Sequence, residues 1–290
     1  MIYASAPGKV NLFFEVGPLR ADGFHSVLSL YQSLAIRQRV GVAAANEWSV
    51  STTGNLPQAQ LDLVPSDEEN LIVVAAKALA DFVGIQNPQP MHFETVKEVP
   101  VAAGLAGGSA DAAAALIALN EAWCLGLSFD QLIEVGSRVG SDVPFALLGG
   151  TAIGVDTGID LTPLTPIPTL HVVLLVSPYG LSTGKVFGKF DELYPQGDLN
   201  LSPEQLLAEI ADGRLTIGKN SLLPAAVDLK PELRELINST DLPLMLSGSG
   251  PTLAFVTADA GQAAKAAEQL RSLGHFLIET TSDARGAELG

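Results

Sequence analysis

Three glycines in a short segment are the first residues whose spacing suggests chemistry. Gly104, Gly107 and Gly108 lie in the segment Pro-Val-Ala-Ala-Gly-Leu-Ala-Gly-Gly-Ser-Ala-Asp at 100–111, and between them Leu105 is the one bulky side chain. Glycine has no Cβ and tolerates positive φ, so the backbone itself can approach a partner closely. We therefore expect main-chain N–H groups to contact a ligand here.

A helix is predicted directly after these glycines. Ser109 suits an N-cap position, and the apolar residues that follow at helical spacing predict one buried stripe; they are Ala112, Ala115, Leu116, Leu119 and Trp123. A helix N-terminus presents unpaired N–H groups and about half a positive charge, which favours phosphate. An ordinary tight turn explains three glycines equally well, and the spacing fits neither a Walker A loop nor a dinucleotide fingerprint.

Two further positions carry reactive side chains beside turn residues. Lys9 follows Ala-Pro-Gly at a bend, and His25 follows Phe24 and an Asp-Gly turn signal. A lone lysine at a bend is usually a solvated surface charge, and a lone histidine is usually a plain surface or core residue. Each therefore needs a partner elsewhere in the chain to become a site.

The elements that would position these residues alternate between strand and helix patterns. In the first half of the chain, the pattern predicts a strand over 3–17 interrupted by a corner at 6–9, a strand over 27–35, and one or two strands over 36–50. A polar loop over 53–66, a helix over 70–84 and a strand over 91–99 are predicted next. The strand over 91–99 leads into the glycine segment. Together they predict a strand-loop-helix unit.

The remaining chain predicts a capped helix and then a second domain. Ser128 caps a helix that Gly140 ends, a strand covers 149–154, and the uncharged, proline-rich stretch 161–169 connects the domains. Beyond it the pattern predicts a strand over 170–176, a helix over 183–194, a helix capped by Ser202 with Gln205 at N3, a helix over 232–237, strands over 244–247 and 252–256, a helix over 260–273 and a strand over 276–280.

Composition limits the classes of protein to consider. The chain has 290 residues, 47% of them hydrophobic, which is enough to bury a sizeable core in two domains. Its longest apolar run, 112–119, is far shorter than the ~20 residues of a membrane helix. The first residues also lack the basic region followed by an apolar block that is typical of a secretory signal. We therefore expect a cytoplasmic protein with no membrane partner. The single cysteine, Cys124, excludes an internal disulfide and is expected to be a buried core thiol.

The charge of the chain argues against a nucleic-acid partner. The formal net charge is -16, whereas binding to nucleic-acid phosphates requires clustered Lys and Arg. Residues 1–40 nevertheless hold four basic side chains against two acidic ones. A small anionic molecule can therefore find a locally positive site in this segment.

Three separated stretches together resemble the motifs of the GHMP small-molecule kinases. They are Ala-Pro-Gly-Lys-Val-Asn at 6–11, the glycine segment at 100–111 and Leu-Ser-Gly-Ser-Gly-Pro at 246–251, in the order and spacing of that family over nearly the whole chain. The stretches at 20–25 and 140–152 also resemble one branch, whose substrate is a cytidine diphosphate sugar alcohol.

The resemblance implies an α+β fold of two domains. The N-terminal domain, assigned to 1–160, would be like domain 2 of ribosomal protein S5, and the C-terminal domain, assigned to 161–290, would be ferredoxin-like. Both substrates would bind in the cleft between them. The implied reaction transfers the γ-phosphoryl group of ATP to the 2-hydroxyl group of the sugar alcohol, in the non-mevalonate route to isoprenoid precursors. A monomer or a weak homodimer is expected.

The same resemblance assigns catalytic roles. Asp142 occupies the position of the family's catalytic aspartate and would accept the proton of the acceptor hydroxyl. Lys9 would stabilise the developing alkoxide and keep Asp142 ionised. Asn11 would orient the same hydroxyl group.

The nucleotide residues follow from the glycine segment and two outlying positions. Backbone N–H groups would surround the triphosphate, Ser109 would reach Mg²⁺ or a phosphate oxygen, and Asn70 and Lys97 match positions near adenine in relatives. The assigned ATP-binding residues are Pro100, Val101, Ala102, Ala103, Gly104, Leu105, Ala106, Gly107, Gly108, Ser109, Ala110, Asn70 and Lys97.

The substrate residues are assigned around the cytosine base. His25 would bond the base, Phe24 would stack on one face of it, and Phe187 would stack on the other. Gly248 and Ser249 would shape the substrate side of the cleft. Phe24 replaces the tyrosine frequent in relatives and retains the stacking surface.

Departures from the family pattern leave alternatives open. Gly8 stands where this branch more often has alanine, Ala106 where glycine is common, and Ala110 where a second serine is common. Alanine at 106 is compatible with the loop if its φ is negative. Another GHMP kinase, for homoserine, mevalonate or a sugar, and a non-catalytic nucleotide-binding protein of the same fold are the alternatives. The Asp-Gly-Phe-His stretch argues against the first, and retention of both Lys9 and Asp142 against the second.

Overall fold

Two β-sheets form the framework of the protein, whose computed structural model describes residues 1–165 and 167–290. The strands of the larger sheet are β1 (Ile2–Leu19), β2 (His25–Ala44), β3 (Ser49–Gly54), β4 (Met91–Lys97), β5 (Thr151–Val155), β6 (Asp160–Pro163) and β11 (Glu288–Leu289). Their order is β11-β1-β2-β4-β3, with β5 beside β2 and β6 beside β5, and every pair except β3 with β4 is antiparallel.

The smaller sheet belongs to the second half of the chain. Its strands are β7 (His171–Leu175), β8 (Met245–Leu246), β9 (Leu253–Thr257) and β10 (Leu277–Thr281). They pair in the antiparallel order β10-β7-β9-β8. The strands expected over 170–176, 244–247, 252–256 and 276–280 are therefore confirmed within one or two residues.

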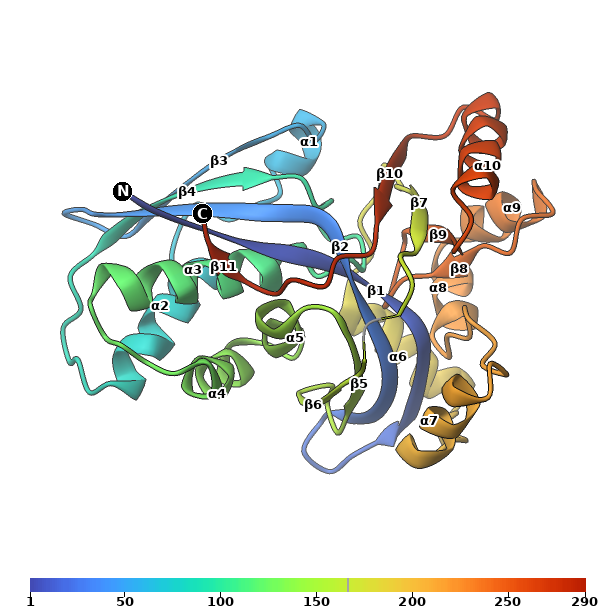
Figure 1. Ribbon diagram of the computed structural model, residues 1–290, viewed down its shortest axis with the longest axis horizontal. Helices are drawn as coiled ribbons and strands as arrows, with labels where there is room; N and C mark the ends of the chain where they lie inside the picture. Colours follow the sequence, from blue (N-terminus) through green and yellow to red (C-terminus); the bar gives the residue numbers. More distant parts are fainter. Residues whose placement is uncertain (166) are drawn as a thin grey trace.

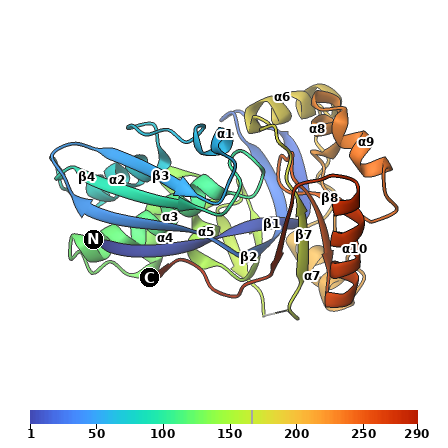
Figure 2. The same ribbon diagram turned by 90° about the horizontal axis from the view of Figure 1, so that it is seen from above.

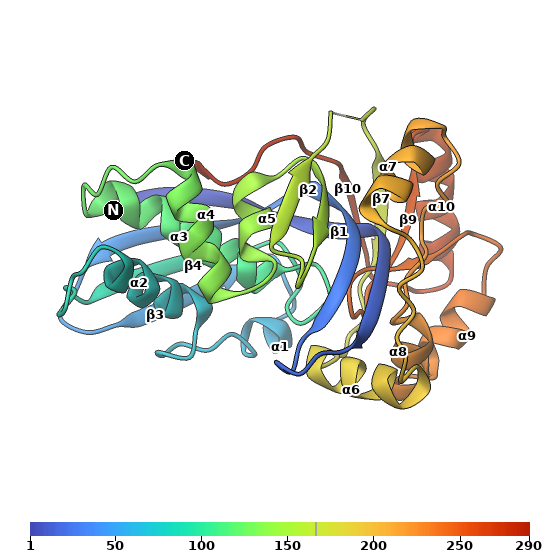
Figure 3. The same ribbon diagram turned by 90° about the horizontal axis from the view of Figure 1, so that it is seen from below.

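Helices cover the sheets in two groups. The first group is α1 (Gln58–Leu61), α2 (Leu71–Phe82), α3 (Gly107–Ala122), α4 (Phe129–Val139) and α5 (Val143–Leu148), and the second is α6 (Thr183–Leu193), α7 (Pro203–Ala211), α8 (Leu223–Leu229), α9 (Glu232–Asn238) and α10 (Ala260–Ser272). α2 to α5 lie on one face of the larger sheet, as Figure 3 shows from below, with α3 against β1 and β2. The second group lies on the side of the smaller sheet (Figure 2), with α10 packed against β7, β9 and β10.

Local signals predict several helix ends correctly. Ser128 and Ser202, both predicted as caps, form complete capping boxes at α4 and α7. Asn70, which was not predicted as a cap, caps α2. The short helices α1, α5 and α8 and the two-residue strand β11 lack a clear period and were not predicted. α10 has its own cap, Asp259, which accepts bonds from the N–H groups of the first turn.

The first two strands are more continuous than expected and join the two halves of the molecule: β1 runs without a break, and β2 joins segments expected as separate strands over 27–35 and 36–50. The corner expected at 6–9 does not interrupt β1; instead, the register with β2 shifts between Pro7 and Lys9 and at two later points. Such bulges bend and twist a strand without ending it. The curved far end of the pair (Figure 1) lies beside the second half of the chain, where Phe14 and Val27 pack into the same core as Leu175.

The end of the chain crosses back to the first sheet. β11 pairs with β1, and the Arg37 guanidinium donates to the Gly286 carbonyl at 2.6 Å and contacts Asp283. The stretch expected to connect the domains, 161–169, begins inside β6, and its residue 166 lies outside the described residues. The domain boundary at 160/161 stays a prediction, with the last residues belonging spatially to the first sheet.

Helix α3 differs from its prediction in its start and its burial. The helix begins at Gly107 with Ala106 as N-cap, so Ser109 is its third residue and the expected Ser109 cap is wrong. The helix is buried on nearly every side rather than along one stripe, because it lies between the sheet and the helices α2, α4 and α5. Its run of alanines allows this close packing.

Cys124 corrects a second expectation. The residue follows the end of α3, has a φ of 52°, and is exposed rather than a buried core thiol. In the described part of the chain, no helix is long and apolar enough to cross a membrane.

Candidate active site

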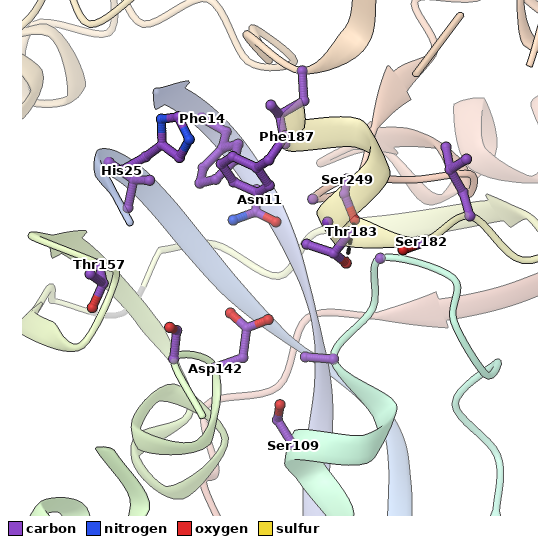
Figure 4. A pocket seen from close by; sticks show the side chains of 18 of the residues that line it. Asn11, Phe14, His25, Ser109, Asp142, Thr157, Ser182, Thr183, Phe187 and Ser249 are labelled. Atoms are coloured by element: carbon purple, nitrogen blue, oxygen red, sulfur yellow. Dashed lines mark hydrogen bonds between the residues drawn. The ribbon is translucent and has the colours of Figure 1, made fainter. Parts of the chain in front are cut away.

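A cavity of about 790 Å³ collects side chains from both halves of the molecule. β1 and β2 form its floor, the glycine segment and the start of α3 form one end, and α6 and the loop at 248–249 form a wall. Figure 4 shows Asp142 and Ser109 toward one end of this space, and His25 and Phe187 toward the other.

The three motif stretches meet at this cavity. The Lys9 N–H donates to the Leu105 carbonyl at 3.1 Å, and the Ser247 hydroxyl donates to the Gly104 carbonyl at 3.0 Å. Gly104 has a φ of 78°, and a Cβ there would lie 2.1 Å from the Ser247 carbonyl oxygen. The loop can pack against the third motif only because this residue is glycine.

Seven residues of the glycine segment line the cavity. They are Ala102, Ala103, Gly104, Ala106, Gly107, Gly108 and Ser109. The first bond inside α3 runs from the Ala110 N–H to the Ala106 carbonyl, so the N–H groups of residues 107–109 have no helical acceptor. This end of α3 can therefore bind an anion.

The backbone of this segment does not meet the condition stated for alanine at 106. Ala106 has a φ of 58° and Ala102 a φ of 50°, whereas a negative φ was the condition under which alanine would suit position 106. Both alanines take the left-handed conformation, which costs a residue with a Cβ roughly 1–2 kcal/mol. Packing against β1 and the loop at 247–250 holds the segment in this shape.

The other assigned residues of the segment lie behind the cavity. Leu105 and Ala110 are fully buried in the core, Pro100 is buried, and the Val101 N–H bonds to Gln60. None of these four is among the lining residues of the described structure. Any contribution they make to nucleotide binding would come through the loop conformation.

The structure does not bring the two residues assigned near adenine into the cavity. Asn70 caps α2 by accepting from the Ile72 N–H and donates to the Pro65 carbonyl at 2.6 Å. Lys97 is 2% exposed and binds the buried carboxylate of Asp111. The neighbouring Leu71, which the sequence did not single out, lines the cavity instead.

Lys9 and Asp142 face each other across the cavity floor. The distance from Lys9 Nζ to Asp142 Oδ2 is 3.7 Å, and Lys9 also donates to Asn11 Oδ1 at 2.7 Å. Burial lowers the pKa of the Lys9 ammonium, while the Asp142 carboxylate opposes this shift. Asp142 is the N-cap residue of α5, but its side chain makes no cap hydrogen bond, so its oxygen atoms are available to a ligand.

Neighbouring groups fix the position of Lys9. Asn11 donates to the Ser29 hydroxyl at 2.7 Å, and Ser29 donates to the Phe13 carbonyl. Lys9 Nζ lies 5.9 Å from the centre of the Tyr31 ring. Burial and the nearby Asp142 carboxylate raise the pKa of Tyr31, which keeps its phenol neutral. Sequence patterns do not single out Tyr31, because its position beside Lys9 depends on how β2 pairs with β1.

Aromatic and polar side chains form the other end of the cavity. Phe24 is 57% exposed, His25 is buried, and the His25 and Phe187 rings lie 5.0 Å apart between centres. All three line the cavity, as do Gly248 and Ser249. The structure thus brings every assigned substrate residue to one space.

Helix α6 supplies groups that the sequence missed. Ser182, Thr183 and Gly184 at its start line the cavity, and the Thr183 and Ser249 hydroxyls lie 3.0 Å apart. Asp191, one turn after Phe187, also lines it. The helix was predicted, but which of its faces meets β2 depends on tertiary packing.

The donor set fits a magnesium ion that is held mainly by a ligand. The described residues contain no cluster of three His, Cys, Asp or Glu side chains that could hold a metal by themselves. Ser109 nevertheless lines the cavity in the first turn of α3, beside the free N–H groups of that helix end. A hydroxyl group and phosphate oxygens are a usual combination of ligands for Mg²⁺, which keeps several waters.

Comparison with known proteins gives one consistent family. The profile of the GHMP kinases N terminal domain matches residues 70–150, and that of the GHMP kinases C terminal domain matches residues 202–275. A relative from Nocardioides sp., 4-diphosphocytidyl-2-C-methyl-D-erythritol kinase, is 41% identical over 283 residues, which is 94% of each chain. The protein of that name from Mycolicibacterium vanbaalenii is 40% identical over 281 residues, 92% of this chain and 85% of the relative.

Solved structures agree with this result. The crystal structure of 4-(cytidine 5'-diphospho)-2C-methyl-D-erythritol kinase matches with a TM-score of 0.72 and 28% identity, over 97% of this chain and 98% of that one. A homoserine kinase from Cytophaga hutchinsonii matches with a TM-score of 0.67 and 15% identity, over 100% and 97% of the two chains, and shows the shared fold alone. The expected α+β architecture of two domains is thereby confirmed.

Proposed function

The chain belongs to the GHMP kinase family, and we propose that it transfers the γ-phosphoryl group of ATP to the 2-hydroxyl group of 4-diphosphocytidyl-2-C-methyl-D-erythritol. The products are the 2-phosphate and ADP, in the non-mevalonate route to isoprenoid precursors. One observation carries the proposal: a single cavity holds a helix N-terminus with free N–H groups, the Lys9 and Asp142 pair, and aromatic side chains around His25.

The glycine segment and α3 bind the triphosphate in this proposal. Residues 107–109 direct N–H groups and the positive end of the helix dipole at the cavity. Lys9 is the one lysine or arginine among the lining residues of the described structure, so the phosphates depend on main-chain N–H groups for most of their contacts. Phosphoryl transfer needs mainly positioning and charge stabilisation, which such a fixed site provides.

Lys9 and Asp142 act on the acceptor alcohol. The 2-hydroxyl oxygen approaches Asp142, which accepts its proton as the oxygen attacks the γ-phosphorus. The buried Lys9 ammonium stabilises the negative charge that develops on the attacking oxygen and the transferred group. Asn11 holds Lys9 through its amide oxygen, which leaves the ammonium two further donors for the reacting groups.

We propose Mg²⁺ as the metal that accompanies ATP, with Ser109 as its protein ligand. Bound Mg²⁺ supplies charge neutralisation to the phosphate oxygens. Ser109 holds its hydroxyl at the first turn of α3, where the metal and the helix end would bind the same phosphates. The proposal also places the reaction in the cytoplasm, where ATP is available.

The aromatic end of the cavity binds the cytosine base. Phe187 and Phe24 offer ring surfaces for stacking, and His25 lies buried beside Phe187. The substrates of homoserine, mevalonate and sugar kinases have no base to fill such a pocket. A non-catalytic nucleotide-binding protein does not need an ammonium and a carboxylate placed 3.7 Å apart at the same floor.

The experiment that tests the proposal is a substrate panel. ADP release from ATP and Mg²⁺ is measured with 4-diphosphocytidyl-2-C-methyl-D-erythritol, mevalonate, homoserine and galactose. We expect rapid release with the cytidine substrate and background release with the other three. Preferred turnover of any of those three, or no turnover of the cytidine substrate, contradicts the proposal.

A further inference from the structure

The two ring nitrogens of His25 have different partners. Nδ1 lies 2.9 Å from the Gly17 carbonyl oxygen, and Nε2 lies 3.4 Å from Asp191 Oδ1. The His25 side chain is 6% exposed and that of Asp191 is 30% exposed. The histidine comes from the start of β2 and the aspartate from α6, so tertiary packing brings this pair together.

The Gly17 carbonyl sets the tautomer of the neutral ring. A carbonyl oxygen only accepts hydrogen bonds, so Nδ1 carries the hydrogen and Nε2 keeps a lone pair. In this tautomer Nε2 and Asp191 Oδ1, 3.4 Å apart, are both acceptors. A donor with two hydrogens that contacts both atoms from the cavity would satisfy the pair.

We propose that His25 Nε2 and Asp191 together recognise the exocyclic amino group of cytosine, which makes Asp191 a specificity-determining residue. This inference rests on the proposed function. The amino group carries two N–H bonds, one for each acceptor, and a nitrogen about 2.9 Å from both can bridge atoms 3.4 Å apart. Uracil has a carbonyl oxygen where cytosine has the amino group. This oxygen is a third acceptor beside Nε2 and the Asp191 carboxylate, so uracil would find no donor there.

The geometry of α6 supports a joint role for its two residues. Phe187 and Asp191 are four positions apart, so they project from the same face of the helix. The Phe187 ring contacts the His25 ring, with centres 5.0 Å apart. Phe187 can therefore cover the face of the base while Asp191 meets its edge. Glu192, the next residue, points away from the cavity and pairs with Lys189 at 2.9 Å.

The test compares cytidine and uridine diphosphate forms of the methylerythritol substrate. kcat and KM are measured for each form with the unchanged protein, Asp191→Asn, Asp191→Ala and the control Glu192→Gln. We expect Asp191→Asn to lower the cytidine-to-uridine ratio of kcat/KM about tenfold or more, because its amide can donate to the uracil oxygen. The loss should lie mainly in the KM for the cytidine form.

The other variants make the result specific. Asp191→Ala removes an acceptor without adding a donor, so its ratio should lie between those of the unchanged protein and Asp191→Asn. Glu192→Gln, which makes the same charge change outside the cavity, should keep the original ratio.

If Asp191→Asn leaves the cytidine-to-uridine ratio unchanged, the inference is overturned. Activity of the unchanged protein on the cytidine form would still uphold the proposed function in that case. Equal losses for both forms also overturn it. Absence of activity on both forms with the unchanged protein overturns the proposed function itself.

Discussion

Two buried lysines each face an aspartate, and the two pairs lie in different surroundings. Lys97 and Asp111 are in direct contact with side chains 2% and 4% exposed, between the end of β4 and the first turns of α3. Lys9 and Asp142 are 3.7 Å apart with side chains 6% and 31% exposed, at the floor of the cavity. The first pair is sealed and the second is open.

The contacts of each carboxylate separate structural from chemical use. Both oxygens of Asp111 are engaged, one by Lys97 and the other by the Thr95 hydroxyl at 3.2 Å, and burial raises the pKa of Asp111 against the effect of Lys97. This pair joins the end of β4 to α3. The Asp142 side chain makes no cap hydrogen bond and meets Lys9 only at a distance, so it can accept a proton from a ligand. A lysine beside an aspartate therefore indicates catalysis only where the carboxylate is left accessible.

The largest effect is expected at the open pair. Asp142→Asn removes the proton acceptor while keeping the shape of the side chain, so turnover should fall about 100- to 10,000-fold. The fold should remain, because the carboxylate is partly exposed and makes no cap hydrogen bond. The measurements are kcat from ADP release and thermal unfolding. Asp130→Asn on the exposed start of α4 is the matched control, and near-normal turnover of Asp142→Asn would remove Asp142 from the reaction.

The sealed pair should control stability instead of chemistry. Lys97→Met leaves the Asp111 carboxylate buried without its cation, which should lower the free energy of unfolding by about 3–5 kcal/mol. Replacing both residues, Lys97→Met with Asp111→Leu, should recover most of this loss. Urea unfolding measures both changes.

The same double variant tests the sequence expectation that Lys97 contacts adenine. If the pair is purely structural, the KM for ATP should change by less than about twofold once stability is recovered. A large rise in this KM, with the KM for the second substrate unchanged, would show that Lys97 reaches the nucleotide and would break the comparison between the two pairs.

The smallest effect is a shift in pH dependence at the open pair. Burial lowers the pKa of Lys9 from the usual 10.5, so the ammonium should lose its proton at a lower pH than a free lysine does. As the pH is raised, kcat/KM should therefore begin to fall before pH 10.5 is reached. Above the lowered pKa of the folded state, the unfolded chain binds more protons at Lys9 than the folded chain does. The contribution of Lys9 to the free energy of unfolding should therefore rise as the pH increases through that pKa. In Asp142→Asn, the residual activity should decline at lower pH, because the carboxylate that raises the pKa is gone. A decline at unchanged or higher pH would contradict this coupling.

The sequence by itself determined the local features and the resemblance. Ser128 and Ser202 cap helices within a few residues of themselves, so their signals are complete in the sequence. The motif at 6–11 and the stretch at 140–152 also carried the assignment of Lys9 and Asp142 to one site, and the structure places the two side chains at the floor of one cavity.

Only the tertiary structure decided which partners these residues meet. Lys97 contacts Asp111 in the core, and Asp191 lies beside His25 in the cavity. Ala106 has a positive φ where its segment packs against β1 and the loop at 247–250. Each outcome depends on segments far apart in the chain that pack at one point. Residue type and spacing give a side chain its chemistry, but burial and neighbouring charge decide whether that chemistry is sealed in the core or open to a substrate.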